Sequence, residues 1–475
     1  MKRSNTLWGD LVRRPIVSRR RYCPLDGKLE AGIIEVEVKP CESVAGIMVY
    51  LMKKHNLIFY MPLRRLLALL FLGLLVREVF SFWTGHPSDF ELWVRMGYAM
   101  VHGGDPYGTL QPVPGLSFSN VYSTANAPTI AYLPFWPLVT GLIYSAYSLV
   151  GVNDRFVYYF LLKQPIIFGD VSLAYLLYSY VSSRKSGSAG FWVLSFWLFS
   201  PFTIIISGIW GMFDSIAICF LIISASSIGQ VRRAFWTGLA IFVKSVPIIF
   251  AAPMTMKNLK SIKGVCGFVA AIGLPVVLSV ATFIIMGWPL STVSTTLVST
   301  AGKGGWSMSI WAVLPYLNYL GMLPPALQNL YGILGLVWIP AIVIFTCIAI
   351  RRFRTETDAG LFRALIVCTL VFLVFKAQVA EQYALYLFAF GAVDVVLWNP
   401  QRKRLLIATM IVAMIYLVVN NYFLVRFLSP IYPNFVDFES TIYNLIGSVR
   451  YAINFLTGTA FTILNVKYLA DVLIE

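Results

Sequence analysis

Residues 362–398 read FRALIVCTLVFLVFKAQVAEQYALYLFAFGAVDVVLW. Two apolar runs, at about 362–378 and 383–398, enclose the short polar segment KAQVAEQY. Helical apolar runs of about this length can cross the roughly 30 Å hydrocarbon core of a bilayer. The stretch therefore predicts two membrane helices joined by a polar turn.

The composition extends this interpretation to the whole chain. Its 475 residues are 58% hydrophobic and only 12% charged, whereas roughly a quarter of a soluble domain is charged. Further apolar runs lie at about 66–83, 130–150, 157–181, 190–209, 213–229, 234–254, 265–287, 331–350, 405–425 and 442–466. We therefore predict an all-α, polytopic transmembrane bundle of about 11–13 spans, with helical external loops.

The net charge of +16 is concentrated between the apolar runs. Cationic loops of a membrane protein face the cytoplasm, so this charge predicts orientation and not a nucleic-acid partner. The pair Arg64-Arg65 precedes the first span and predicts a cytoplasmic N-terminus. The other loops assigned to the cytoplasm contain Arg184-Lys185, Arg232-Arg233, Lys257 to Lys263, Arg351 to Arg354, and Arg402 to Arg404.

Placing all these loops on one side constrains the path of the chain. Cations flank the 234–254 run on both sides, and Lys244 and Pro247 interrupt it, so it should enter and leave on the same side. One of the runs 130–150 and 157–181 should also fail to cross, and the pair Pro134/Pro137 favours the first. Four polar stretches then share the external face: 85–128, 208–214, 288–330 and 376–383.

Residues 1–65 differ from the rest, with 13 Lys/Arg against 6 Asp/Glu. They form either a cytoplasmic extension or a segment before a later start, at Met48, Met52 or Met61. No signal-peptide pattern is evident in them. Two of the six cysteines lie in this segment and the other four in apolar runs, without metal-ligand spacing, and the three histidines do not suggest a metal site.

Asp89 is the first candidate for chemistry. It lies in HPSDFELW, a few residues beyond the first span and among aromatic residues. A carboxylate at this depth can stay ionised while facing a lipid-borne substrate, and can accept a proton from an attacking hydroxyl or bind a cation. The structural alternative is that Ser88 or Asp89 caps a surface helix over 90–100.

The second acidic candidate is Asp214, in the turn SGIWGMFDS between two apolar runs, with Trp210 beside it. A tight turn explains the glycines, but an acid so close to the next helix is costly unless it faces a cavity or a partner. Capping of that helix is the alternative.

Isolated cations and polar groups in apolar surroundings form the third set. Lys163 and Asp170 are two helical turns apart and share a face of one helix. Several buried lysines at one face would suit an anionic ligand such as a phosphate, and pairing with acids is the alternative. The remaining candidates are Lys244, Lys376, Glu381, Gln382 and Tyr383.

The order of these motifs along the chain resembles that in the GT-C superfamily of membrane glycosyltransferases. The resemblance covers about residues 66–390 and uses Asp89 with the turn Gly104-Asp105-Pro106-Tyr107 after it. It continues through short segments beginning at Tyr132, Lys163, Ser200, Gly211, Val243 and Lys376. Residues 66–390 would then be the catalytic module, and 391–475 C-terminal transmembrane helices.

The resemblance implies a fold and an activity. Asp89 would be the catalytic carboxylate of an inverting transfer of a hexose, mannose-like, from a polyprenyl-phosphate donor to a lipid-linked or glycan acceptor. Asp214 would face the same cavity, and the lysines would serve the lipid phosphate. No cofactor is expected, although a divalent cation is compatible with the chemistry. Neither acid belongs to an Asp-x-Asp pair, and Met212 stands where a glutamine is common, which leaves metal dependence and the sugar open.

Two other classes fit parts of the sequence. A transporter or lipid-linked-sugar flippase would share the spans and buried cations, and a scaffolding subunit would share the spans. The acid in a long first external loop favours the enzyme. We expect a plasma-membrane protein with its active site on the extracytoplasmic face.

Overall fold

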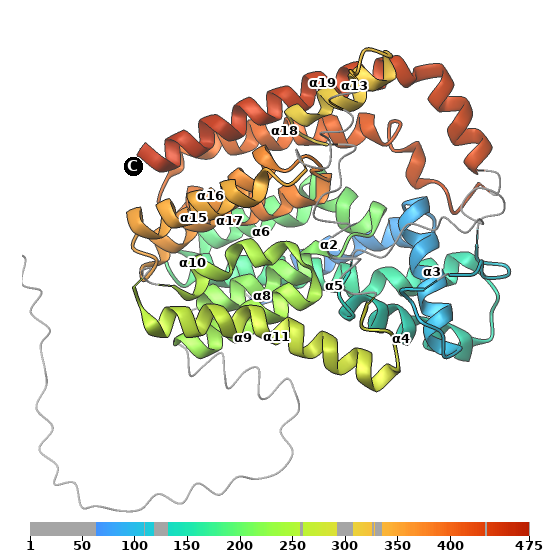
Figure 1. The fold of residues 1–475 in the computed structure, drawn as a ribbon, viewed down its shortest axis with the longest axis horizontal. Helices are drawn as coiled ribbons and strands as arrows, with labels where there is room; N and C mark the ends of the chain where they lie inside the picture. The colour runs from blue at the N-terminus through green and yellow to red at the C-terminus, as the bar shows by residue number, and fades with distance from the viewer. Residues whose placement is uncertain are drawn as a thin grey trace, which may run out of the picture. The chain divides into compact units, whose positions relative to one another are not determined.

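The computed structural model describes residues 63–108, 110–117, 132–256, 260–291, 307–324, 327, 335–432 and 435–474. Apart from one isolated bridge between Gly85 and Leu428, all regular secondary structure in these ranges is helical (Figure 1). The predicted all-α fold class is therefore confirmed. The prediction for residues 1–62 lies outside the described residues.

The first half of the chain forms a series of helices joined by short turns. They are α2 (Leu63–Ser81), α3 (Pro87–Val101), α4 (Phe135–Val150), α5 (Arg155–Ser182), α6 (Gly187–Phe199), α7 (Pro201–Ile204), the π-helix η1 (Ile205–Trp210), α8 (Asp214–Ser226) and α9 (Gln230–Val243).

The second half continues in the same way. Its elements are η2 (Val246–Phe250), α10 (Ala251–Thr255), α11 (Ile262–Met286), η3 (Ile310–Ala312), α13 (Val313–Tyr319), α15 (Trp338–Arg352), α16 (Asp358–Phe375), η4 (Glu381–Tyr383), α17 (Ala384–Leu397), η5 (Pro400–Arg402), α18 (Lys403–Asn420), η6 (Val425–Phe427) and α19 (Phe435–Ile474).

Fewer helices have the length of a membrane span than the 11–13 predicted. Among the described residues four are long and apolar enough, within 155–182, 262–286, 358–375 and 400–420. A fifth is obtained if 187–199 and 201–210, bent by 48° at their junction, count as one span. The difference arises because α4, α8, α15 and α17 have only 13–16 residues and because the 234–254 run is divided into three short helices.

The 234–254 run shows this division. Helix α9 ends at Lys244, and η2 and α10 lead the chain back towards the start of α9. The Gln230 side chain donates to the backbone oxygen of Thr255 at 2.8 Å, so both ends of the run meet. The chain thus returns to the end of the bundle where the run began, as predicted from the flanking cations.

Helix α4 is the other run expected not to cross, and with 16 residues it is shorter than the membrane-length helices. It packs closely along α3 through glycine. A Cβ on Gly97 would lie 2.7 Å from the backbone oxygen of Thr140, so only glycine allows this approach of the two helices.

The basic loops meet at one end of the bundle. Arg184, just after α5, pairs with Asp358 at 2.5 Å. Arg352, at the end of α15, donates to the backbone oxygen of Ile474 at 3.1 Å. Arg402 reaches the oxygen of Asp471 at 3.0 Å. The common location agrees with the grouping predicted from loop charge.

The candidate functional site

Asp89 lies in the first turn of α3, at the opposite end of α5 from these basic loops. Its N-cap residue is His86, whose side chain makes no capping hydrogen bond, and Pro87 opens the helix. Neither Ser88 nor Asp89 is therefore the N-cap, and the capping alternative is wrong for both. A carboxylate in the first turn is favoured by the helix dipole.

Two aromatic groups hold this carboxylate. Trp210 Nε1 donates to Asp89 Oδ2 at 2.8 Å, and His86 Nδ1 lies 3.1 Å from the same oxygen. The His86 and Trp210 rings stack with centroids 5.1 Å apart, and Phe427 lies against both. The Asp89 side chain keeps 21% of its surface exposed, so it is oriented but remains accessible.

The surroundings keep Asp89 ionised. Burial raises the pKa of this carboxyl, but the charge of His86 and the hydrogen bonds from His86 and Trp210 outweigh burial, with a further contribution from Arg426. The pKa therefore lies below its usual value. Asp89 is a carboxylate at neutral pH and can accept a proton.

The position of Trp210 depends on the turn that follows it. Gly211 has φ of 91°, a left-handed conformation that favours glycine. A Cβ there would lie 2.9 Å from the Phe90 ring. The turn thus lets η1 end directly beside the start of α3, where Trp210 reaches Asp89.

Lys163 stabilises the same turn. Its ammonium donates to Thr84 Oγ1 at 2.8 Å and to the backbone oxygens of Gly208 at 2.8 Å and Ile209 at 3.0 Å. An ammonium has three hydrogens to donate, and these contacts use all of them. The side chain is fully buried. Lys163, predicted to bind substrate, is thus a structural cross-link beneath the site in this structure.

Asp170 is part of a buried network and does not contact Lys163. Its Oδ2 pairs with Arg77 at 2.6 Å, and it also accepts from Trp197 and Ser215 at 3.1 and 2.5 Å. The alternative that the buried lysines pair with acids does not hold for Lys163 and Asp170, because α2 brings Arg77 against Asp170. Both oxygens of the Asp170 carboxylate are thus bonded to protein groups, so Asp170 does not face a substrate.

Asp214 is the first residue of α8, and Phe213 is its N-cap, so the capping alternative does not hold. Its Oδ2 forms an ion pair with Lys244, which lies over the Phe213 ring at 4.9 Å. The two candidates therefore pair with each other. Asp214 Oδ1 is buried and has no hydrogen-bond partner among the described residues, so one of its oxygens can still accept a bond from a ligand.

Two tyrosines connect the acidic residues. Burial, together with the charges of Asp89 and Asp214, raises the pKa of both Tyr132 and Tyr383. Each phenol therefore lies within electrostatic reach of both carboxylates. Lys244 also lies 5.7 Å from the Tyr383 ring centroid. The structure thus brings five predicted residues together: Asp89, Asp214, Lys244, Trp210 and Tyr383. With Tyr132 and His86, we call these residues the Asp89 cluster.

Glu381 and Gln382 border this cluster from η4. Glu381 is buried and accepts from the side-chain amide of Asn420 at 2.7 Å. Burial raises its pKa, against the opposing effects of that hydrogen bond and of Arg426 and Arg450. Gln382 Oε1 is buried without a hydrogen-bond partner among the described residues.

Lys376, at the C-cap of α16, differs from the other lysines. Its ammonium lies 5.4 Å from the Trp338 ring and 6.0 Å from the Phe372 ring, and it makes no ion pair with a described residue. It is largely buried, and burial lowers its pKa to about 8. Of the three predicted lysines, Lys376 has the fewest protein partners in the described part of the chain.

The sequence did not single out the segment after α18, which covers the Asp89 cluster. Tyr422, Phe423 and Leu424 all have φ between 50° and 70°. Non-glycine residues pay a conformational cost in this region. The resulting turn directs η6 towards α3, where Gly85 N donates to Phe427 O at 2.8 Å and Ser429 Oγ to Gly85 O at 2.8 Å.

This contact adds residues to the site that lie outside 66–390. Arg426, in η6, acts electrostatically on both Asp89 and Glu381. Arg450 donates to Asn420 Oδ1 at 3.1 Å and to Tyr422 Oη at 2.9 Å. The C-terminal helices predicted as a separate part thus complete the cluster, and all described residues belong to one compact unit. The available signal was Arg426, a single cation in the aromatic and aliphatic stretch NYFLVRFLSP at 421–430.

No group of three His, Cys, Asp or Glu residues in the described ranges is arranged to hold a metal ion. No protein-family model matches the sequence, and a comparison with curated proteins finds no relative. The cluster itself offers an ionised carboxylate, a second carboxylate with an unpaired oxygen, and several phenol, indole and amide groups. Such a set can orient a polyhydroxylated ligand and accept a proton from it.

Proposed function

We propose that this protein is a membrane-embedded inverting glycosyltransferase. It would transfer a hexose, mannose-like, from a polyprenyl-phosphate donor to a lipid-linked or glycan acceptor at the extracytoplasmic face of the plasma membrane. The observation that carries the proposal is Asp89, a carboxylate kept ionised and partly accessible beside a second acid. It rests also on the resemblance of the motif order to the GT-C superfamily.

The position of the cluster supports a lipid-borne donor. It lies near the start of α5, a helix of 28 residues that is long and apolar enough to cross a membrane. A polyprenyl phosphate keeps its chain in the bilayer, so its sugar is presented at the membrane surface. The basic loops at the far end of α5 favour the cytoplasm there, which supports an extracytoplasmic location for the Asp89 end.

The reaction would be a single displacement at the anomeric carbon. The acceptor hydroxyl oxygen attacks this carbon from the face opposite the phosphate, and Asp89 takes the hydroxyl proton. The new C–O bond forms as the bond to the phosphate oxygen breaks. The electron pair leaves on the polyprenyl phosphate, and the configuration at the anomeric carbon inverts.

Other groups in the cluster and around it would bind and orient the reactants. Asp214 Oδ1 and Gln382 Oε1 can each accept a hydrogen bond from a sugar hydroxyl, because both are buried without a partner in the described part of the chain. Trp210 fixes the Asp89 carboxylate. Lys376 is the candidate for the donor phosphate, since Lys163 and Lys244 already have partners.

The test is sugar transfer by the purified protein in liposomes that contain a polyprenyl-phosphate hexose and a lipid-linked acceptor. Asp89→Asn should reduce transfer by at least about 100-fold, the scale of a lost general base. Asp105→Asn is the matched control, since Asp105 lies in the same loop and bonds locally to the backbone nitrogen of Tyr107 at 2.9 Å. Full activity of Asp89→Asn would refute the proposed role.

The same liposomes distinguish the proposed enzyme from the alternative, a transporter or flippase. The alternative predicts movement of the lipid-linked sugar across the vesicle without a covalent product. The buried charges of Arg77, Lys163 and Asp170 do not favour such a path, because each is bonded to protein groups. Translocation without transfer would replace the proposed function.

A further inference from the structure

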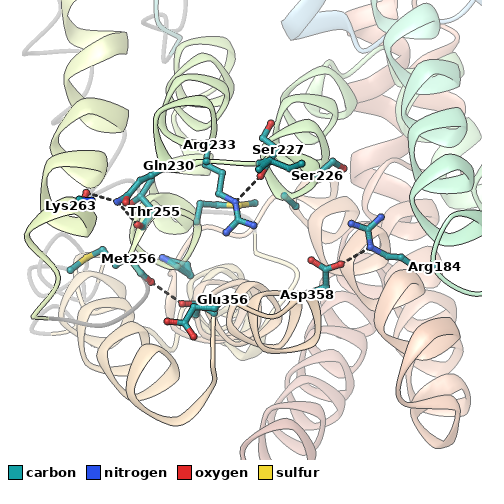
Figure 2. A pocket seen from close by; sticks show the side chains of 16 residues that line it. Arg184, Ser226, Ser227, Gln230, Arg233, Thr255, Met256, Lys263, Glu356 and Asp358 are labelled. Carbon is teal, nitrogen blue, oxygen red and sulfur yellow. Dashed lines mark hydrogen bonds and ion pairs between the residues drawn. The ribbon is translucent and has the colours of Figure 1, made fainter. Parts of the chain in front are cut away.

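A second site lies at the other end of α5, away from the Asp89 cluster. Arg184 follows α5, and Lys163 supports the turn before Trp210 of the cluster, so at 1.5 Å per residue Arg184 and Lys163 are roughly 30 Å apart along the helix. Near Arg184 is a cavity of about 490 Å³. The ends of α8, α9 and α10 and the α15–α16 connection surround it (Figure 2).

Most residues that line the cavity have polar side chains, and its cations outnumber its anions. Its charged side chains are Arg184, Arg233, Lys263, Glu356 and Asp358. Arg184 and Asp358 pair with each other at 2.5 Å, which leaves Arg233 and Lys263 against Glu356.

Arg233 is the central group of this cavity. Its Nε donates to the backbone oxygen of Ser227 at 3.1 Å, which fixes the side chain. Figure 2 shows its guanidinium reaching into the middle of the cavity, with Arg184 and Asp358 on one side and Lys263 on the other. A fixed guanidinium of this kind is suited to bind a phosphate through two parallel hydrogen bonds.

An apolar groove continues from the polar cavity. It has a volume of about 560 Å³ and runs between α9 and α11. The two cavities share Gln230 and Lys263 as lining residues. The groove is otherwise lined by Val231, Ala234, Phe235, Ile262, Cys266 and further apolar residues of α11.

The groove opens towards the surroundings of the bundle. Val231 and Ile262 at its start are 84% and 80% exposed. Helix α11 is a membrane-length helix, and only 22% of its apolar window is buried inside the protein. An exposed apolar helix of this length faces lipid, so the groove is accessible from the bilayer.

A cationic pocket joined to a lipid-facing groove has the shape and chemistry of an amphiphile with an anionic head. The geometry points to a binding site for one anionic phospholipid of the bilayer. Its phosphate would bind Arg233 and Lys263, and an acyl chain would lie in the groove between α9 and α11. The site is independent of the sugar-transfer reaction proposed above, and its ligand would stabilise the junction of α9, α10 and α11.

Native mass spectrometry tests this on the full-length protein released from nanodiscs of phosphatidylglycerol and phosphatidylcholine in equal amounts. We expect one phosphatidylglycerol to remain bound under conditions that remove other lipids. The double variant Arg233→Gln/Lys263→Gln should retain it roughly 30-fold less, the effect of removing two cations. Ala270→Trp, which fills the groove without changing charge, should also lose it.

Arg232→Gln/Lys260→Gln is the matched control. It removes two cations at the starts of the same two helices, α9 and α11, and neither residue lines either cavity. Equal loss in this control would overturn the site in favour of general charge attraction. Equal retention of phosphatidylcholine would also overturn it. Displacement by soluble glycerophosphoglycerol at the same concentration as the lipid would show a site for a free anion instead.

Discussion

Replacing Arg77 by leucine should destabilise the protein strongly, because this side chain joins three helices. Arg77 is fully buried and donates to Asp170 through Nη2 and Nε, at 2.6 and 2.7 Å. Its Nη1 also donates to the backbone oxygens of Gly73 at 2.9 Å and Leu198 at 3.0 Å. These bonds connect α2, α5 and the end of α6 at one point.

The loss of unfolding free energy follows from the groups that remain around Asp170 after the substitution. Arg77→Leu leaves the Asp170 carboxylate buried without its cation, and such a loss costs about 3–5 kcal/mol. Ser207, Ser215 and Trp197 still donate to Asp170, so we expect the lower end, about 3 kcal/mol. The double variant Arg77→Leu/Asp170→Leu removes both charges, and should therefore be more stable than either single variant.

The assay is unfolding in mixed micelles with a rising fraction of sodium dodecyl sulfate, followed by circular dichroism. A double-mutant cycle for Arg77 and Asp170 should give a coupling free energy of about 3 kcal/mol. The matching cycle for Lys163→Met and Asp170→Leu should be additive within about 0.5 kcal/mol, because those residues do not touch. Coupling to Lys163 in place of Arg77 would refute the reasoning.

Two further predictions concern the Asp89 cluster. His86→Phe retains an aromatic ring beside Trp210 but removes the charge and hydrogen bond that lower the pKa of Asp89. Since Asp89 accepts a proton only as a carboxylate, the acid limb of the pH–rate profile should move to higher pH. The control is His102→Phe, at an exposed histidine just after α3, which should leave the acid limb unchanged. Burial lowers the pKa of Lys376 to about 8, so Lys376 is charged below that pH and loses its proton above it. The KM for the lipid-phosphate donor should therefore increase when the pH is raised past 8. In Lys376→Arg, which stays charged, this KM should remain constant. A pH-independent KM in the unmodified protein would contradict the assignment of Lys376 to the phosphate.

Local patterns predicted the helical class, the grouping of the basic loops and the return of the 234–254 run. These properties depend on composition and on the order of charges along the chain. Lys244 and Pro247 interrupt an apolar run wherever it lies, so a break there could be read directly. The number of spans could not, because an apolar run does not reveal whether its helix continues through it.

The partners of the buried charges were beyond the reach of local patterns. Spacing placed Lys163 and Asp170 on one helical face, but pairing depends on which neighbouring helix presents a charge at that depth. Arg77 is 93 residues from Asp170 and nevertheless binds it. Asp214 and Lys244 form a pair for the same reason, since both face the junction between α8 and the end of α9.

The sequence by itself determined that this chain is helical with apolar runs of membrane length, and it indicated Asp89 as the candidate acid, because hydrophobicity and charge order are properties of the chain. Tertiary structure alone decided what surrounds Asp89. Gly85 and Ser429 are 344 residues apart, yet the segment after α18 lies on the start of α3 and brings Phe427 and Arg426 to the site. Contacts at that separation depend on the packing of whole helices, which no local pattern of residues encodes.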